Sequence, residues 1–134
     1  MTMFSDYYED VIINLMRGVA FTAVTAYVAL FTAATGLEAD NPTAEVSGGS
    51  YARKLAGLSA GSGGVSANAG DITFTTATAP WGTVTHVALV THVSNVTWGT
   101  DVHVLMSGIL DTQKTIGTGD TFKISAGDLD VIVT

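Results

Sequence analysis

The residues most suggestive of chemistry lie in one short stretch, EVSGGSYARKLAG, at residues 45–57. Two adjacent glycines, Gly48 and Gly49, precede a tyrosine and two cations, so the stretch invites comparison with a phosphate-binding loop. Such a loop needs the pattern G-x-x-x-x-G-K-[ST] between a strand and a helix. Here no Lys-Ser or Lys-Thr follows at that spacing, and the next residues favour a strand. We therefore expect the glycines to supply positive φ angles at a chain corner, Tyr51 to pack inward and Arg53 to pair with an acid.

Three histidines raise the question of a metal site. His86 and His92 lie on one face of a predicted strand, but six residues separate them, or roughly 20 Å. His92 and His103 become neighbours only if a hairpin turns between them, and two histidines without a third ligand make a weak site. The acids between residues 38 and 45 do not match the spacing of an EF-hand calcium loop. We therefore expect no bound metal.

Catalytic groups are abundant as types but are not organised by any recognisable spacing. The chain has no cysteine, which excludes thiolate catalysis and disulfides. Serine, histidine and aspartate are all present, yet no set of them is singled out, and the same holds for a glycosidase pair of carboxylates. We expect a protein without enzymatic activity and without a cofactor.

The two tryptophans leave a second binding hypothesis open. Trp81 and Trp98 could form a platform on which sugar rings stack. Trp81, however, stands between Pro80 and Gly82 at the entry to a predicted strand, which is more typical of a core or corner residue.

Composition indicates a surface that is partly covered by neighbours. Of the 134 residues, 47% are hydrophobic and only 13% are charged, whereas about 25% are charged in an average globular chain. The formal net charge is −7 with five cations, so the clustered cations that neutralise nucleic-acid phosphates are lacking. The most apolar stretch, residues 19–34, is interrupted by threonines and follows acidic residues, so we expect neither a membrane span nor a secretion signal.

The N-terminal residues predict one amphipathic helix, and we assign residues 1–20 to a helical arm. Ser5 or Asp6 can cap its start, and Gly18 can end it in a left-handed conformation. A helix this short is marginally stable alone, so it must dock on its own sheet or on another subunit. Apolar residues recur at the helical period: Tyr8, Val11, Ile12, Leu15, Met16 and Val19.

Residues 21–134 predict a single antiparallel β-sandwich, jelly-roll-like, because about seven strands are separated by turn signals roughly every ten residues. The first strand, AYVALFT, is apolar on both faces, as expected for a strand that is covered on both sides. Residues 34–46 and 59–70 predict loops. The expected strands are 26–32, 50–58, 71–77, 83–93, 102–110, 121–124 and 129–133.

Six segments, taken in order, resemble a family of small structural proteins of tailed bacteriophages, whose members are labelled tail fibre, minor tail or head decoration proteins. The resemblance is weakest at residues 93–104, where the family more often has an acidic, glycine-rich turn. The segments are YVALFTA (27–33), EVSGGSYAR (45–53), ITFTTATAPWGTVTHVAL (72–89), LMSGIL (105–110), KTIGTGDTFKI (114–124) and AGDLDV (126–131).

The resemblance implies a virion protein without catalytic residues, in which Glu45 and Arg53 are partners at a structural corner. A compact domain without heptads or a shaft repeat favours a head decoration protein that binds the capsid surface. A minor tail or fibre-associated protein, and a carbohydrate-binding module for the host surface, are the alternatives. We expect assembly in the host cytoplasm, contacts with the major capsid protein or other virion proteins, and self-association. The expected interface residues are Phe4, Tyr7, Tyr8, Ile12 and Leu15.

Overall fold

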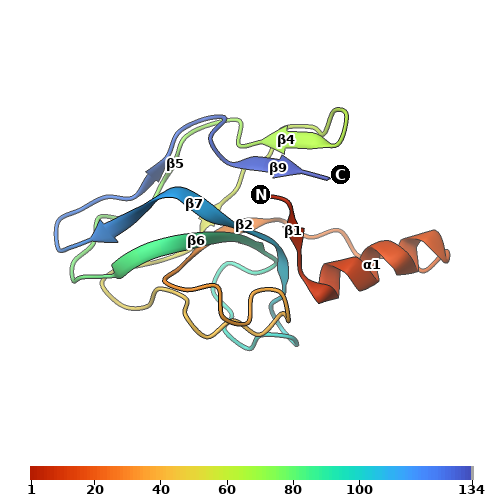
Figure 1. The fold of residues 1–134 in the computed structure, drawn as a ribbon, viewed down its shortest axis with the longest axis horizontal. Coiled ribbons are helices and arrows are strands. Elements are labelled where there is room, and N and C mark those ends of the chain that lie inside the picture. The colour runs from red at the N-terminus through yellow and green to blue at the C-terminus, as the bar shows by residue number, and fades with distance from the viewer. Residues whose placement is uncertain (134) are drawn as a thin grey trace.

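The computed structural model describes residues 1–133; Thr134, the last residue of the predicted β domain, lies outside the described residues. Within them the protein is mainly β, with an N-terminal helix followed by antiparallel strands (Figure 1), which confirms the predicted fold class. The elements are β1 (Met3–Phe4), α1 (Asp6–Met16), β2 (Tyr27–Phe31), β3 (Lys54–Leu55), β4 (Val65–Ala67), β5 (Ile72–Thr73), β6 (Gly82–Val90), β7 (Val104–Ile116), β8 (Lys123–Ile124) and β9 (Asp130–Ile132).

A five-stranded antiparallel sheet, in the order β1-β7-β6-β2-β3, forms the larger layer. Its centre is the β6–β7 hairpin, and β2 pairs with β6 from Tyr27 opposite Val90 to Phe31 opposite His86. Four consecutive residues of β2, Val28–Phe31, are 0% exposed. The unbroken apolar run of this strand thus reflects burial on both faces, as the sequence predicts.

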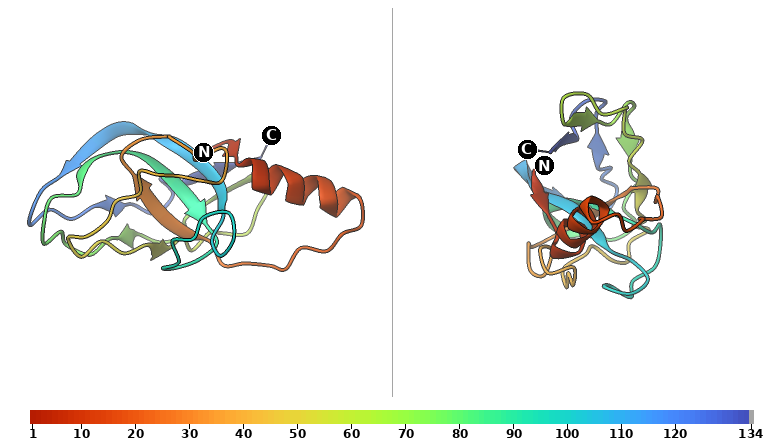
Figure 2. Two further views of the ribbon diagram at one scale, coloured as in Figure 1. Left: turned by 90° about the horizontal axis from the view of Figure 1, so that it is seen from below. Right: turned by 90° about the vertical axis from the view of Figure 1, so that its right-hand side faces the viewer.

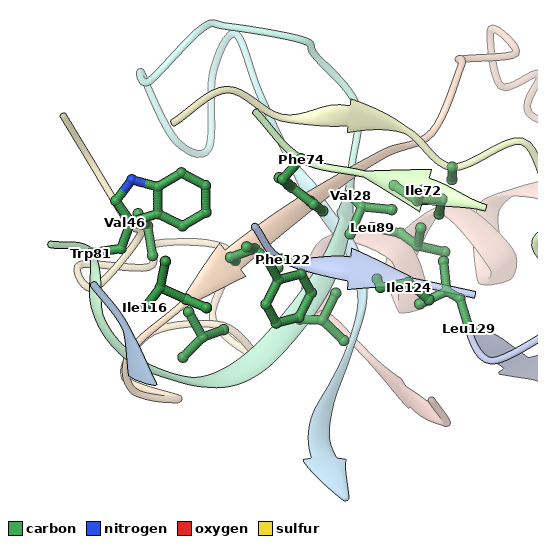
Figure 3. Packing of buried hydrophobic residues seen from close by; sticks show 14 of the residues in the cluster. Val28, Val46, Ile72, Phe74, Trp81, Leu89, Ile116, Phe122, Ile124 and Leu129 are labelled. Atoms are coloured by element: carbon green, nitrogen blue, oxygen red, sulfur yellow. The ribbon is translucent and has the colours of Figure 1, made fainter. Parts of the chain in front are cut away.

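The second layer consists of two short antiparallel ribbons, β4-β9 and β5-β8. Hydrogen bonds from Phe74 N to Phe122 O (2.9 Å) and from Ala77 N to Asp120 O (2.9 Å) continue the pairing beyond β5 and β8. Apolar side chains from this layer meet those of the larger sheet and form the main core (Figure 3). Members of this core include Val28, Leu30, Ile72, Phe74, Trp81, Val84, Leu89, Ile116, Phe122, Ile124, Leu129 and Val131.

A second apolar cluster lies on the opposite face of the larger sheet. Ala29 and Phe31 of β2 and Ala88 and Val90 of β6 point to this side, because side chains alternate along a strand. The loops at residues 32–46 and 91–103 contribute Leu37 and Val102 and half-buried Trp98 to the cluster. These loops therefore act as a third layer over the sheet.

The first residues of the chain join the two main layers. The Met1 ammonium donates to Asp130 O, and Ile132 N donates to Met1 O at 3.0 Å. At the same time β1 pairs with β7, where Met3 lies opposite Ser107. Residue 108 has to be glycine in this arrangement, since a Cβ there would lie 2.9 Å from the Met1 Cβ.

Several strands differ from the predicted ones, and β1 lies within the predicted helical arm at residues 1–20. The predicted loop at 59–70 contains β4, because its three small residues gain a partner, β9, that is distant in sequence. The predicted strand at 50–58 shrinks to β3, since Ser50 has a φ of 64° that interrupts an extended chain. The predicted strand at 102–110 instead runs on to Ile116, past an irregularity in the pairing opposite β6.

The N-terminal helix α1 starts and ends at the predicted signals. The Ser5 Oγ caps it by accepting a hydrogen bond from Tyr8 N at 3.2 Å, and Gly18 follows its end with a φ of 82°. The helix has 11 residues, and none of its side chains is fully buried. No helix within residues 1–133 is long and apolar enough to cross a membrane.

Replacing Phe74 with alanine should lower the free energy of unfolding by about 3–5 kcal/mol, because the ring is 1% exposed and the change leaves a cavity. Urea denaturation followed by fluorescence measures the change. Ile109→Ala, at a side chain that is 73% exposed, is the control and should change stability by less than about 0.5 kcal/mol. Equal effects of the two substitutions would contradict the location of the core.

Candidate functional site

The glycine corner turns the chain through three consecutive left-handed residues. Gly48, Gly49 and Ser50 have φ angles of 73°, 56° and 64°. The carbonyl of Gly49 accepts a hydrogen bond of 2.9 Å from the Trp81 indole. A Cβ at residue 49 would lie 2.7 Å from Ala79 O, so the close approach of two backbone segments requires glycine here. Through this carbonyl the corner binds its own chain, and the residues after it lead into β3 and not into the helix that a phosphate-binding loop requires.

Arg53 is the centre of the corner and is only 5% exposed. Its Nε and Nη2 donate to the two carboxylate oxygens of Glu45, each at 2.7 Å. Its Nη1 donates to the backbone carbonyls of His92 and Asn95, each at 2.8 Å. The ring of Trp98 lies 4.9 Å from the guanidinium carbon, within cation–π distance. One side chain therefore holds residue 45, the loop at 92–95 and Trp98 together.

Tyr51 completes this network. Its hydroxyl donates to Glu45 Oε1 at 3.0 Å and accepts from Leu30 N of β2 at 3.0 Å. Burial, followed by the nearby Glu45 carboxylate, raises the pKa of Tyr51 well above its usual value, so the hydroxyl stays protonated and can donate. The ring packs edge-on against Trp81 at 5.4 Å between centroids.

The corner network is internally satisfied. A cavity of about 430 Å³ lies beside it, lined by Glu45, Tyr51, Arg53 and Trp98 among others. Nearly every polar atom of this cluster is already bonded within the chain, and within residues 1–133 no buried side-chain nitrogen or oxygen lacks a partner. Because a binding site needs polar groups that are free to meet a ligand, this corner has the character of a structural cross-link.

The glycan platform suggested by the two tryptophans is not formed. Trp81 is 6% exposed and belongs to the main core, so its ring offers no face to a sugar (Figure 3). Trp98 is half-buried between Arg53 and Phe31. The two rings belong to different apolar clusters, on opposite faces of the larger sheet.

The histidines are bound individually within the chain. His86 contacts Thr85, and the Nδ1 of His92 accepts from Ser94 N and Asn95 N. Residues 1–133 contain no group of three or more histidine, aspartate or glutamate side chains placed to hold a metal ion.

His103 has the most elaborate surroundings of the three. Its Nδ1 lies 2.5 Å from Asp40 Oδ2, and the Tyr7 ring stacks on it at 3.7 Å. Asp40 is 7% exposed, and its other carboxylate oxygen accepts from Val104 N at 2.6 Å. This cluster joins α1, the loop at 32–46 and the start of β7. Sequence reasoning missed it because 63 residues separate Asp40 from His103.

The sequence contains GLSAG at residues 57–61, which matches the Gly-x-Ser-x-Gly pattern of a catalytic serine, so the expectation that this spacing is absent was wrong. That pattern requires a sharp turn from a strand into a helix. Here the segment joins β3 to β4, and the Ser59 hydroxyl lies 3.3 Å from that of Ser66. No described histidine is hydrogen-bonded to Ser59, so the match carries no catalytic arrangement.

Of the five expected interface residues, three pack against the main core, one is half-buried and one is exposed. Phe4, Tyr7 and Tyr8 pack against the main core and anchor the first turn of α1. Ile12 is half-buried, and Leu15 is 51% exposed. The rest of α1 projects away from the β layers, and the chain returns to β2 through an extended segment (Figures 1 and 2). We call residues 19–26 the strap, and α1 with the strap the arm.

The arm carries large exposed apolar side chains and borders an apolar groove. Ile13, Leu15, Met16, Val19 and Val24 are between 42% and 77% exposed. The groove has a volume of about 510 Å³ and lies between α1, the strap and the β layers. Its lining residues are all uncharged: Tyr8, Leu15, Phe21, Ala23, Val24, Ala26, Leu58, Leu89, Leu105, Met106, Val131 and Val133.

The described residues thus form a small β protein with an apolar groove and exposed apolar side chains at one end. The family model described as "Podophage GP4 fiber I protein gp80" matches residues 3–132. The chain belongs to this family. No curated protein matches the sequence. The fiber I membership confirms the resemblance to phage virion structural proteins, and it fits the fibre-associated alternative better than the head decoration role expected first.

In this fiber I family member, Glu45→Ala should lower the free energy of unfolding by about 3–5 kcal/mol, because it leaves the Arg53 guanidinium buried without its carboxylate. Chemical denaturation measures the effect. Glu45→Ala combined with Arg53→Met should be less destabilising than Glu45→Ala alone, since no unpaired charge remains. A neutral Glu45→Ala variant would contradict the structural role of the network.

Asp40→Ala should cost about 1–3 kcal/mol, because Val104 N then loses its buried acceptor. It should also loosen the docking of Tyr7, which hydrogen exchange of the α1 amides would show as lower protection. Asp101→Ala, at an exposed acid in the neighbouring loop, is the matched control and should leave protection unchanged. Unaltered α1 exchange in the Asp40 variant would contradict the anchoring role of this cluster.

Proposed function

We propose that this protein is a structural subunit associated with the tail or tail fibre of a podophage, and that it works through protein–protein contacts rather than catalysis. The observation that carries the proposal is the family match across residues 3–132, in a family described as a fiber protein. The exposed apolar arm supports it, because monomeric soluble proteins rarely expose large contiguous apolar surfaces without a binding role.

The polar chemistry of the described residues supports a non-enzymatic role. An active site generally combines a concave pocket with polar groups that converge on a ligand and have perturbed pKa values. In residues 1–133 the buried groups Asp40 and Arg53 and the half-buried Tyr51 are each committed to partners in the same chain. The raised pKa of Tyr51 therefore reflects its structural position.

The surface also supports assembly with other virion proteins. Specific protein interfaces bury about 1,200–2,000 Å² in total, with an apolar centre and few charges there. The groove has this composition, since its lining has no charged residue, whereas α1 brings Asp6, Glu9 and Asp10 to the arm. The net charge of −7 makes nucleic acid an unsuitable partner for the remaining surface.

Location in the particle tests the proposal. We expect gold-labelled antibodies against the protein to mark the tail or its fibres, and mass spectrometry of purified particles to count far fewer copies than of the major capsid protein. A uniform label over the head, with a copy number close to that of the capsid protein, would favour the decoration role instead. Absence of the protein from purified particles would contradict both roles.

A further inference from the structure

We propose that the open edge of β7 binds an extended peptide segment of another protein, which pairs as an added strand and places apolar side chains in the groove between β7, β8 and β9. We call this hollow the edge groove. It shares no lining residue with the groove at the arm, so the inference names a second contact surface. It goes beyond the proposed function, because peptide binding can hold wherever the protein lies in the particle.

Most of the outer edge of β7 has no partner strand. β7 has 13 residues, but within residues 1–133 β1 pairs only with Met106 and Ser107. Leu105 O accepts from Ser5 N at 3.1 Å, so the backbone groups of Leu105 face β1. Directions alternate along an antiparallel strand, so the N–H and C=O of Ile109 face the same outer side. An unpaired edge of this kind is a template for another strand.

A bulge in β7 limits the length of the added strand. The register with β6 passes from His86 opposite Ile109 to Val84 opposite Lys114, which leaves residues 110–113 as the bulge. Regular pairing along the open edge is interrupted there. The added strand is therefore short and pairs with β7 around Ile109, before the bulge.

The first residues of the chain show how a strand-like segment lies between β7 and β9. β1 pairs with β7, whereas the Met1 ammonium donates to Asp130 O and the Met1 carbonyl accepts from Ile132 N at 3.0 Å. The space between the two strands is thus closed as far as Met1 (Figure 1). Beyond Met1, along β7, it opens into the edge groove, of which Met1 is a lining residue. A peptide on the line of β1 would continue this arrangement.

The edge groove has an apolar floor. Its volume of about 370 Å³ lies in the range of ligand pockets. Four of its lining residues, Val87, Phe122, Ile124 and Leu129, belong to the main core (Figure 3). In strand addition, main-chain hydrogen bonds give affinity, and pockets for alternate side chains give specificity. An apolar side chain of the peptide would therefore extend the main core.

The charge of the groove favours a peptide that contains a lysine or arginine. Lys114 and the Met1 ammonium are the cations of the lining that remain, because Lys123 pairs with Asp71 at 3.1 Å. Three carboxylates against these two cations leave one negative charge for a cationic side chain to match. The carboxylates, none of which has an ion-pair partner within residues 1–133, are Asp111, Asp128 and Asp130.

A second copy of this chain is a poor source of such a peptide. Each copy has a net charge of −7, so two copies repel one another where their acids meet. The extended strap and the connection at 57–64 contain no cation. The occupant that we name is therefore a basic, extended segment of a different protein.

Backbone amide NMR of the purified full chain tests strand addition. The probe is the blocked peptide acetyl-Lys-Val-Thr-Val-Lys-Val-amide at up to millimolar concentration. We expect hydrogen exchange of the Ile109 amide to slow by about tenfold at saturation, while exchange of the Val96 amide in an exposed loop stays unchanged. Two analogues carry N-methyl groups on alternate sets of residues. At least one should bind about tenfold more weakly, since it loses its N–H donors to β7.

The charge of the groove has its own test. Asp128→Asn should weaken binding of the probe by about two- to fivefold, as expected for an exposed charge pair. Asp101→Asn, at an exposed acid that does not line the groove, is the matched control and should leave binding unchanged. Equal weakening by the two substitutions would overturn the placement of the peptide.

Cross-linking locates the peptide, because the natural chain has no cysteine. Ile109 is 73% exposed, so Ile109→Cys should fold normally. This variant is mixed with a probe that has cysteine in place of threonine and is treated with a short bismaleimide. We expect a covalent complex, and little of it with Val96→Cys, at a side chain that is 70% exposed. A yield no higher than that of the Val96→Cys mixture would overturn the proposed site.

The remaining outcomes separate this inference from the proposed function. No change in any amide signal at millimolar probe, or equal binding of both N-methylated analogues, would overturn strand addition and leave the role in the tail intact. Protection of the Ile109 amide that rises with protein concentration, without peptide, would also overturn it, since a second copy would then pair with the edge. Absence of the protein from particles would contradict the proposed function but not peptide binding.

Discussion

The structure depends on covering both faces of one sheet. β2 has apolar side chains on both faces, and neither face can be left to solvent without a large cost. One face is covered by the ribbons β4-β9 and β5-β8, and the other by the loops at 32–46 and 91–103. Loops lack a regular ladder of hydrogen bonds, so side chains have to hold them, and the networks of Arg53 and Asp40 do this.

The need to cover apolar surface also explains why few residues of the chain are charged. The few ionisable groups that are buried serve as links between segments, and part of the apolar surface that the fold does not cover lies on the arm. In a free monomer this distribution is a liability, because exposed apolar surface promotes indiscriminate association. In the proposed role as a subunit of a phage particle, the same surface serves as a directed contact, and the chain belongs to the fiber I family.

Local patterns could be read from the sequence, and distant partnerships could not. The Ser5 cap, the Gly18 stop and the doubly buried β2 each follow from neighbouring residues. The strand β4 and the Asp40–His103 pair depend on segments more than 60 residues away, and no local signal marks them. Trp98 was ambiguous for the same reason, because its burial depends on Arg53, which is distant in sequence.

The buried guanidinium of Arg53 links separate segments of the chain without a covalent bond. Small extracellular proteins often tie their loops with disulfides, whose formation depends on the redox state of the surroundings. Here the loops are tied by an ion pair, carbonyl bonds and a stacked ring, in a chain that has no thiol. The fold therefore needs no disulfide, whether the surroundings are reducing or oxidising.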